Sequence, residues 1–256
     1  MTRILVTNDD GIHSSGLIKL EEALREVGDV YVVAPASEMS GASHSLTLAR
    51  PLRIRQVDDH HWTVDGTPTD CVTLALNKIL GSNELPDICV SGINHGGNLG
   101  DDATYSGTVA GALEATILGV PGLALSLVAR EHFDFTEAAQ FAVTAARKVL
   151  TEGLPEGTLL NINIPPREIK GVRVTRQGIK NARTVISEHI DPRGKPYFWI
   201  GEEYFRTNSA QGTDYQAVES GYISVTPLKS DMTDHRALTA IKSWNFVNAS
   251  EVLERG

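Results

Sequence analysis

Two adjacent carboxylates directly follow the first apolar run of the chain. Residues 4–12 read ILVTNDDGI, so Asp9 and Asp10 stand where a buried strand would end. Neighbouring anions repel each other and raise each other's pKa unless a cation or strong hydrogen-bond donors stabilise the ionised forms. The pair therefore indicates a cation site, although Asp-Asp-Gly after a strand is also a common turn.

Oxygen-bearing side chains follow three of the predicted strands. They are Asn8, Asp9 and Asp10 after the first strand, several in loop 37–45 after the second, and Ser91, Asn94 and Asn98 after a third. Ligands of open parallel sheets bind beyond the carboxyl ends of the strands. Carboxylate, hydroxyl and amide oxygens suit Mg²⁺ or Mn²⁺, suit Ca²⁺ less well, and suit zinc poorly.

A second candidate feature lies where a helix is predicted to begin. Ser106 and Thr108 flank Gly107 in YSGTVAGALEA, so backbone N–H groups, two hydroxyls and the helix dipole could hold a phosphate. Cation and helix N-terminus together would form a phosphoryl-transfer site. Ser-Gly-Thr before a helix is also ordinary capping chemistry.

Other polar motifs are less informative. His44 and His95 fall in the same loops and could donate protons or contact phosphate, although most loop histidines simply face solvent. The segment GGNLG lacks the G-x-G-x-x-G order, so a nicotinamide site is not expected. Cys71 and Cys89 lack C-x-x-C spacing and are expected to be reduced core thiols rather than a disulfide or zinc site.

The elements that position these residues alternate between apolar and amphipathic stretches, which is typical of a parallel α/β sheet. The predicted strands are 3–7, 29–36, 87–92, 122–127 and 158–165, and the predicted helices are 14–28, 69–80, one from Thr108, and 135–150. A small hairpin is expected over 51–57 and 61–66.

The pattern changes after Pro165. Residues 170–210 are predicted to form extended hairpins, 221–228 a strand, and 233–244 a helix with Thr233 as its N-cap. We therefore expect one domain over 1–256, with an α/β core of about 1–165 and an extension of about 166–256 that contributes to oligomerisation.

The composition of the 256 residues, with 41% hydrophobic and 21% charged, is that of a globular protein. A net charge of −9 without a basic run argues against nucleic acid or an anionic membrane as the main partner. The sequence contains no run of about eighteen apolar residues and no secretory signal pattern, so a cytoplasmic location is expected.

Six segments, in order, resemble the conserved blocks of the SurE family of survival-protein nucleotidases. They are ILVTNDDGI, VVAPASEMSGASHSLTL, VDGTPTDCV, VSGINHGGNLGDDATYSGTVAGALE, LNINIP and GYISVTPL.

The resemblance implies a Rossmann-like three-layer α/β/α sandwich with a C-terminal hairpin and helix extension. It also implies a phosphomonoesterase, a 5′-nucleotidase or acid-type phosphatase, that uses one Mg²⁺ or Mn²⁺ per subunit. The implied substrates are nucleoside 5′- and 3′-monophosphates and, in some members, short polyphosphate. Homodimers or homotetramers are expected by similarity, although residues 180–210 match the family less well.

The resemblance also implies roles for individual residues. The metal ligands fall on Asp9, Asp10, Ser40 and Asn94, of which the two aspartates are also the catalytic candidates, and the phosphate pocket falls on Asn98, Ser106, Gly107 and Thr108. Further substrate contacts could come from Asn8, Ser43, His44 and His95. A metal-activated water would then attack phosphorus.

Three alternatives stay open at this point. An aspartyl-phosphate mechanism is less favoured, because the D-x-D spacing of that class is absent. The same pocket could belong to a non-catalytic nucleotide or metal sensor, or the acidic loops could be surface turns of a structural oligomer. The sequence leaves the preferred base and sugar open.

Overall fold

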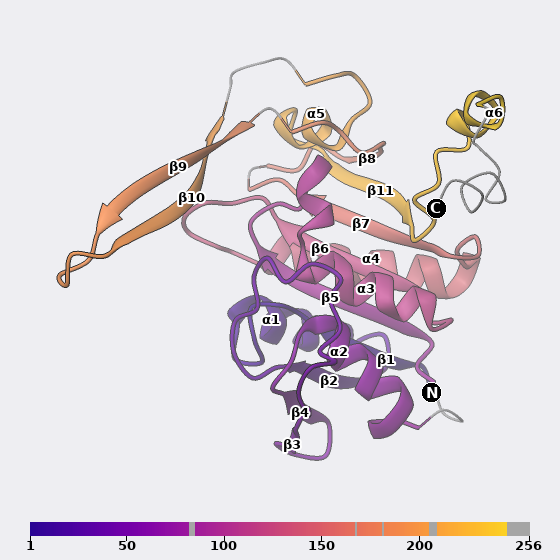
Figure 1. Ribbon diagram of the computed structural model, residues 1–256. Helices are drawn as coiled ribbons and strands as arrows, with labels where there is room; N and C mark the ends of the chain where they lie inside the picture. The colour runs from indigo at the N-terminus through magenta and orange to yellow at the C-terminus, as the bar shows by residue number, and fades with distance from the viewer. Residues whose placement is uncertain (82–84, 167, 181, 205–208, 245–256) are drawn as a thin grey trace, which may run out of the picture.

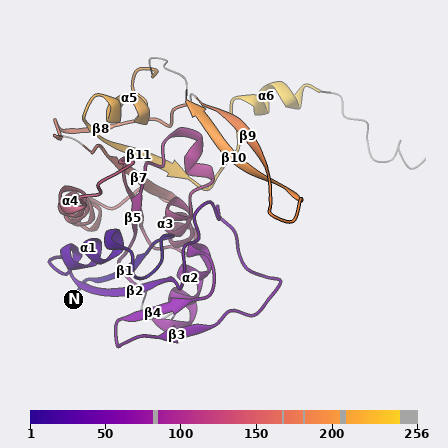
Figure 2. The ribbon, with the colours of Figure 1, turned by 90° about the vertical axis from the view of Figure 1, so that its left-hand side faces the viewer.

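A nine-stranded sheet separates two layers of helices (Figures 1 and 2). The computed structural model describes residues 1–81, 85–166, 168–180, 182–204 and 209–244. The strand order is β3-β4-β2-β1-β5-β6-β7-β11-β8, and the strands from β4 to β7 are parallel. The Rossmann-like α/β fold predicted from the sequence is confirmed.

Five of the six parallel strands match predicted ones. The six are β1 (Arg3–Thr7), β2 (Asp29–Pro35), β4 (His61–Val64), β5 (Ile88–His95), β6 (Gly122–Leu127) and β7 (Thr158–Ile164). β5 runs past residue 92 to His95, so Asn94 and His95 lie at the end of the strand and not in the loop expected after it. The expected small hairpin is β3 (Ile54–Gln56) with β4, and β4 also pairs with β2, so this hairpin extends the main sheet.

Helices cover both faces of the sheet. α1 (Ser15–Leu24) and α4 (Thr136–Glu152) lie on one face, and α2 (Pro68–Leu74) and α3 (Gly107–Ile117) lie on the other (Figure 2). The π-helical segment η1 (Ala75–Ile79) continues α2. Because the central strands are buried on both faces, successive residues of β1 enter different cores: Ile4 packs in the α1 and α4 layer, and Leu5 packs with α2.

The residues after 165 contribute to the main sheet as well as extending it. β11 (Ile223–Lys229) pairs antiparallel with β7, and β8 (Val172–Val174) pairs parallel with β11. Segment 171–177 was expected in a hairpin, which is wrong because it forms this edge strand instead. The sheet therefore continues past the boundary expected near residue 165.

A separate hairpin projects from the body of the protein (Figure 1). It consists of β9 (Ala182–Ile190) and β10 (Pro196–Tyr204), joined by the turn in the DPRGKP segment, as predicted. We call these two strands the arm. No strand of the main sheet pairs with the arm among the residues that the structure describes.

The last described helix, α6 (Ala237–Lys242), begins later than predicted. Thr233 is not its N-cap, so that prediction is wrong. The side chain of Asp234 accepts the backbone N–H groups of Arg236 and Ala237, and this delays the first helical turn. Two short helices were not predicted from the sequence, namely the 3₁₀ helix η2 (Gly100–Thr104) and α5 (Asp214–Glu219). None of the described helices is both long and apolar enough to span a membrane.

Gly92 in β5 is predicted to be essential for the fold. Its φ is +137°, and an added Cβ would lie 2.4 Å from the carbonyl oxygen of Leu125 on β6. Gly92→Ala should therefore lower the free energy of unfolding by about 3 kcal/mol or prevent folding, since strain and overpacking add. Urea denaturation measures the change. Gly201→Ala is the control, because its Cβ would meet only the Val185 carbonyl at 3.7 Å. Equal stability of the two variants would contradict the prediction.

Candidate active site

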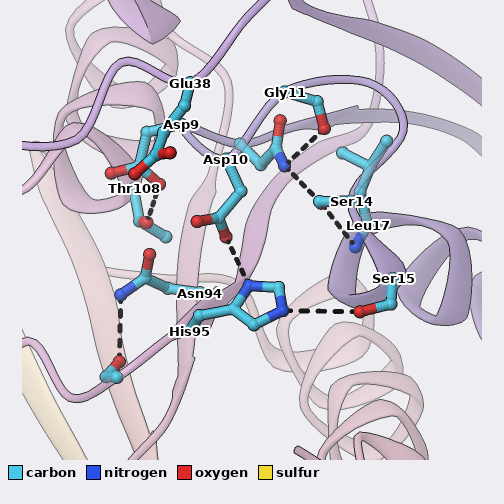
Figure 3. Close-up of polar contacts among 12 residues, drawn as sticks. Asp9, Asp10, Gly11, Ser14, Ser15, Leu17, Glu38, Asn94, His95 and Thr108 are labelled. Carbon is cyan, nitrogen blue, oxygen red and sulfur yellow. Dashed lines mark hydrogen bonds and ion pairs between the residues drawn. The ribbon is translucent and has the colours of Figure 1, made fainter.

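The candidate site lies where the strand order of the sheet reverses direction. The chain moves outward from β1 to β2 on one side, and β5, β6 and β7 follow on the other side of β1. Ligands of open α/β sheets bind at such switch points. Because β1 and β5 are hydrogen-bonded neighbours, their carboxyl ends bring Asp9 and Asp10 next to Asn94 and His95 (Figure 3).

Asp9 is a buried carboxylate with one strong donor. Only 4% of the residue is exposed, and the Thr108 hydroxyl donates to Asp9 Oδ1 at 2.5 Å. Burial raises the pKa of Asp9 to about 6, the Thr108 hydrogen bond lowers it, and the charge of Asp10 adds to the rise. The ionised form of Asp9 therefore lacks sufficient positive charge from the protein alone.

Asp10 and Asn94 complete an oxygen-lined space next to Asp9. Asp10 Oδ2 lies 3.0 Å from His95 Nδ1, which leaves the other carboxylate oxygen available. The Asn94 amide nitrogen donates to the Gly96 carbonyl at 2.9 Å, so the Asn94 amide oxygen turns toward the two carboxylates (Figure 3). Three side-chain oxygens from β1 and β5 thus face one another.

The N-terminus of α3 packs directly against Asp9. Ser106 is the N-cap, and its hydroxyl accepts the Val109 N–H at 3.0 Å. A Cβ at Gly107 would lie 2.8 Å from the Cβ of Asp9, so only glycine permits this approach. Ser106, Gly107 and Thr108 therefore lie together beside the carboxylates, at a helix N-terminus that could receive an anion.

The loop after β2 is tethered to the same place. The Met39 N–H donates to the Asp9 carbonyl oxygen at 2.8 Å. Ser40 is exposed, and its hydroxyl donates to Glu38 Oε1 at 2.8 Å rather than to either aspartate. The structure thus brings the backbone of this loop to the site, whereas the Ser40 side chain is turned to another carboxylate. Glu38 was not singled out from the sequence, because no motif marks it.

Ser43 and His44 fasten the same loop to α3 and to the segment before it. The Ser43 N–H donates to the Tyr105 carbonyl at 3.0 Å, and the Ser43 hydroxyl donates to the Thr104 carbonyl at 2.7 Å. His44 Nε2 lies 2.8 Å from Glu114, and this hydrogen bond lowers the pKa of the buried Glu114 carboxyl. These partners give both residues an anchoring role in the loop.

Asn98 is buried in a network of amides. Its side chain donates to the Ser126 hydroxyl at 2.8 Å, and its backbone N–H donates to Asn163 Oδ1 at 2.8 Å. The amides of Asn161 and Asn163 in turn donate to the Asn98 carbonyl oxygen. Asn161 and Asn163 were missed as supporting residues, although two asparagines in the otherwise apolar strand LNINIP are a usable signal.

Asn8 supports the turn that carries the carboxylates. Its amide nitrogen donates to the Gly11 carbonyl at 3.0 Å and to the Ser14 hydroxyl at 2.8 Å, and Ser14 is the N-cap of α1. Its amide oxygen is buried and has no hydrogen-bond partner. Asn8 therefore fixes the turn from beneath, between β1 and α1.

The donor set fits a hard divalent cation. No three His, Cys, Asp or Glu side chains converge on a metal-binding point among the described residues, so a zinc-type site is not supported. The oxygens of Asp9, Asp10 and Asn94, together with the insufficiently compensated charge of Asp9, match the ligand chemistry of Mg²⁺ or Mn²⁺, which also retain water ligands.

Fold and site together define an α/β protein with an oxygen-lined polar site at the switch point of a mainly parallel sheet. A family model described as Survival protein SurE matches residues 4–184. The chain belongs to this family, as the six sequence blocks predicted.

Relatives and one solved structure agree over nearly the full length. The chain is 49% identical to the 5′-nucleotidase SurE of Aquifex aeolicus over 246 residues, covering 94% of this chain and 98% of the relative. It is 50% identical to that of Geobacter sulfurreducens over 249 residues, covering 95% and 94%. The crystal structure of the SurE protein from Aquifex aeolicus superimposes with a TM-score of 0.84, covering 94% of this chain and 98% of that one.

Asp9→Asn tests whether the carboxylate pair is a cation site. The pKa of folded Asp9 is raised from 3.8 to about 6, so the metal-free protein should lose stability as the pH rises through this window. Asn keeps the acceptor for Thr108 but carries no charge. At neutral pH and with chelator present, the variant should be up to about 3 kcal/mol more stable than the parent, since one pKa unit corresponds to about 1.4 kcal/mol.

Urea denaturation at several pH values measures this difference. The exposed Asp59→Asn is the matched control and should follow the parent. Added Mn²⁺ should stabilise the parent and Asp59→Asn but not Asp9→Asn. If Asp9→Asn showed the same pH dependence and the same response to Mn²⁺ as the parent, Asp9 would belong to a simple turn.

Proposed function

We propose that the chain is a divalent-metal-dependent phosphomonoesterase that hydrolyses nucleoside 5′-monophosphates to a nucleoside and phosphate. The observation that carries this proposal is the buried Asp9 carboxylate, held by Thr108 between Asp10 and the N-terminus of α3. The relatives named 5′-nucleotidase SurE, at 45–50% identity over nearly the whole chain, support the nucleotide as substrate.

Asp9, Asp10 and Asn94 would hold the metal ion through oxygen atoms. Ser40 would join them only after its hydroxyl turned away from Glu38. When bound, Mg²⁺ or Mn²⁺ supplies positive charge to a phosphoryl oxygen and acidity to the attacking water. Thr108 fixes the orientation of Asp9, and His95 contacts Asp10. Because both aspartates are committed to the ion, we favour attack by water over a covalent aspartyl phosphate.

The helix N-terminus would bind the phosphate itself. Ser106, Gly107 and Thr108 lie at the first turn of α3, where the helix dipole favours an anion despite the negative net charge of the protein. Asn98 is held by Ser126 and by the asparagines of β7, so it can offer a fixed polar group without reorganisation. The loop tethered by Met39 and Ser43 would shield this pocket from bulk water.

Removal of metal is expected to abolish turnover. Exhaustive chelation should reduce phosphate release from a nucleoside 5′-monophosphate to background, and Mn²⁺ or Mg²⁺ should restore it, because the carboxylates cannot replace the charge of the ion. A phosphate-release panel across nucleoside 5′- and 3′-monophosphates and short polyphosphate would define the substrates. Saturable nucleotide binding without phosphate release would instead indicate a binding module, and full activity without metal would refute the mechanism.

We also propose that the arm takes part in a homodimer or homotetramer. In the β9 and β10 register Ile186 lies opposite Ile200, and Phe198 lies two residues along the same face. Ile186 is 57% exposed, Phe198 57% and Ile200 79%. An isolated two-stranded hairpin is marginally stable in water, and an exposed apolar face of this kind usually contacts a partner.

Ile186→Glu should reduce the oligomeric mass. The substitution places a charge beside Phe198 and Ile200. Ser187→Glu is the comparison, because it places the same charge opposite Trp199 on the other face and so distinguishes the two faces of the arm. Light scattering measures the mass of each variant. Point variants are preferable to a truncation near Pro166, because truncation would also remove β8 and β11 from the main sheet. Unchanged mass for Ile186→Glu would exclude this face from the interface.

A further inference from the structure

At the end of β5, the ring of His95 packs against a stacked pair of phenylalanines. Its ring centroid lies 4.7 Å from that of Phe133 and 4.8 Å from that of Phe135, in edge contacts at 67° and 78°. The two phenylalanine rings stack on each other at 5.9 Å, and Phe135 is almost fully buried. The imidazole therefore has little freedom to rotate, although 29% of its side chain is exposed.

Both ring nitrogens of His95 face partners within the protein (Figure 3). Nδ1 lies 3.0 Å from Asp10 Oδ2, and Nε2 lies 3.4 Å from the hydroxyl of Ser15 in α1. An ionised carboxylate can only accept hydrogen bonds, so Nδ1 carries the proton toward Asp10. Nε2 can then accept a hydrogen bond from the hydroxyl of Ser15. Both ring nitrogens therefore have a partner within the protein, and the shorter contact is the one to Asp10.

We propose that His95 is a positioning residue that fixes the carboxylate of Asp10 for the metal ion. It holds Asp10 Oδ2, so the other oxygen points toward Asn94 and the space beside Asp9 (Figure 3). This inference rests on the proposed metal-dependent function. It differs from the sequence-based expectation, which placed His95 among the possible substrate contacts.

Each of the two carboxylates then has one oxygen held by a hydrogen-bond donor. Thr108 of α3 occupies Asp9 Oδ1, and His95 of β5 occupies Asp10 Oδ2. Each aspartate keeps one oxygen for the ion, and each is oriented by a donor that would not touch the ion itself. Such supporting hydrogen bonds commonly change metal affinity about ten- to hundredfold when they are removed.

The test uses three substitutions that separate the two ring nitrogens. His95→Asn keeps a donor near the position of Nδ1, His95→Gln places its amide near the position of Nε2, and His95→Leu keeps only apolar packing against the phenylalanines. Calorimetric titration with Mn²⁺ alone measures metal affinity without any substrate. Urea denaturation in chelator shows whether each variant is folded, and steady-state kinetics with a nucleoside monophosphate gives KM and kcat.

The order of Mn²⁺ affinity among the three variants shows whether His95 acts as a hydrogen-bond donor to Asp10 or only packs against the phenylalanines. His95→Asn should stay within a few-fold of the parent, whereas His95→Gln and His95→Leu should bind about ten- to hundredfold more weakly at unchanged folding stability. Parent-like affinity in His95→Gln or His95→Leu would overturn the proposal, and so would an Asn variant as weak as the Leu variant. A raised KM with unchanged Mn²⁺ affinity would identify a substrate contact instead. A parent protein that neither bound Mn²⁺ nor released phosphate would refute the proposed function itself.

Discussion

The structure depends on the close approach of the first turn of α3 to the end of β1. Gly107 has no Cβ, so the helix N-terminus can pack directly against Asp9, and Thr108 then donates to a carboxylate that burial alone would protonate more readily. One contact thus joins a strand end, a helix N-terminus and a buried charge. A larger side chain at position 107 would separate the carboxylates from the helix N-terminus where an anion can bind, although the turn after β1 and helix α3 could each still form.

The same contact explains how an acidic protein could accept an anionic ligand. The net charge is −9, so the overall field opposes a phosphate. Local positive potential comes instead from oriented peptide dipoles at the start of α3, and an oxygen-bound cation would add to it. Because these sources are partly buried, salt screens them less than it screens the exposed surface charges. The negative surface charge can therefore keep the protein soluble without preventing an anion from binding at the site.

The strands and the ends at which polar side chains collect could be predicted from the sequence, because both depend on local patterns. β1, β5 and β6 appear as short apolar runs. Because parallel strands have their carboxyl ends at the same edge of the sheet, the sequence also indicates that Asp9 and Asn94 lie close together. Partners from distant segments could not be predicted. The Asn98 network needs β7, 63 or 65 residues away, and the carboxylate that holds His44 lies 70 residues further along the chain.

The predictions that failed involve competition between local alternatives. Thr233 is a common N-cap residue type, but the Asp234 carboxylate accepts the N–H groups of Arg236 and Ala237, and the helix begins only at Ala237. Segment 171–177 has the alternation of a hairpin strand, yet β11 presents a free edge that it pairs with. In both cases the local propensity is real, but a neighbouring residue or strand that the local pattern does not reveal decides the structure.

The placement of the site on β1 and β5 also determines when the site would lose its geometry during thermal unfolding. These two strands are the centre of the sheet, and their residues line the cores on both faces. A site built on peripheral loops can melt while the rest of a protein stays folded, but here the two carboxylates directly follow a central strand, and of the proposed metal ligands only Ser40 lies on an exposed loop outside the sheet. The carboxylates should accordingly keep their arrangement until the sheet itself unfolds cooperatively.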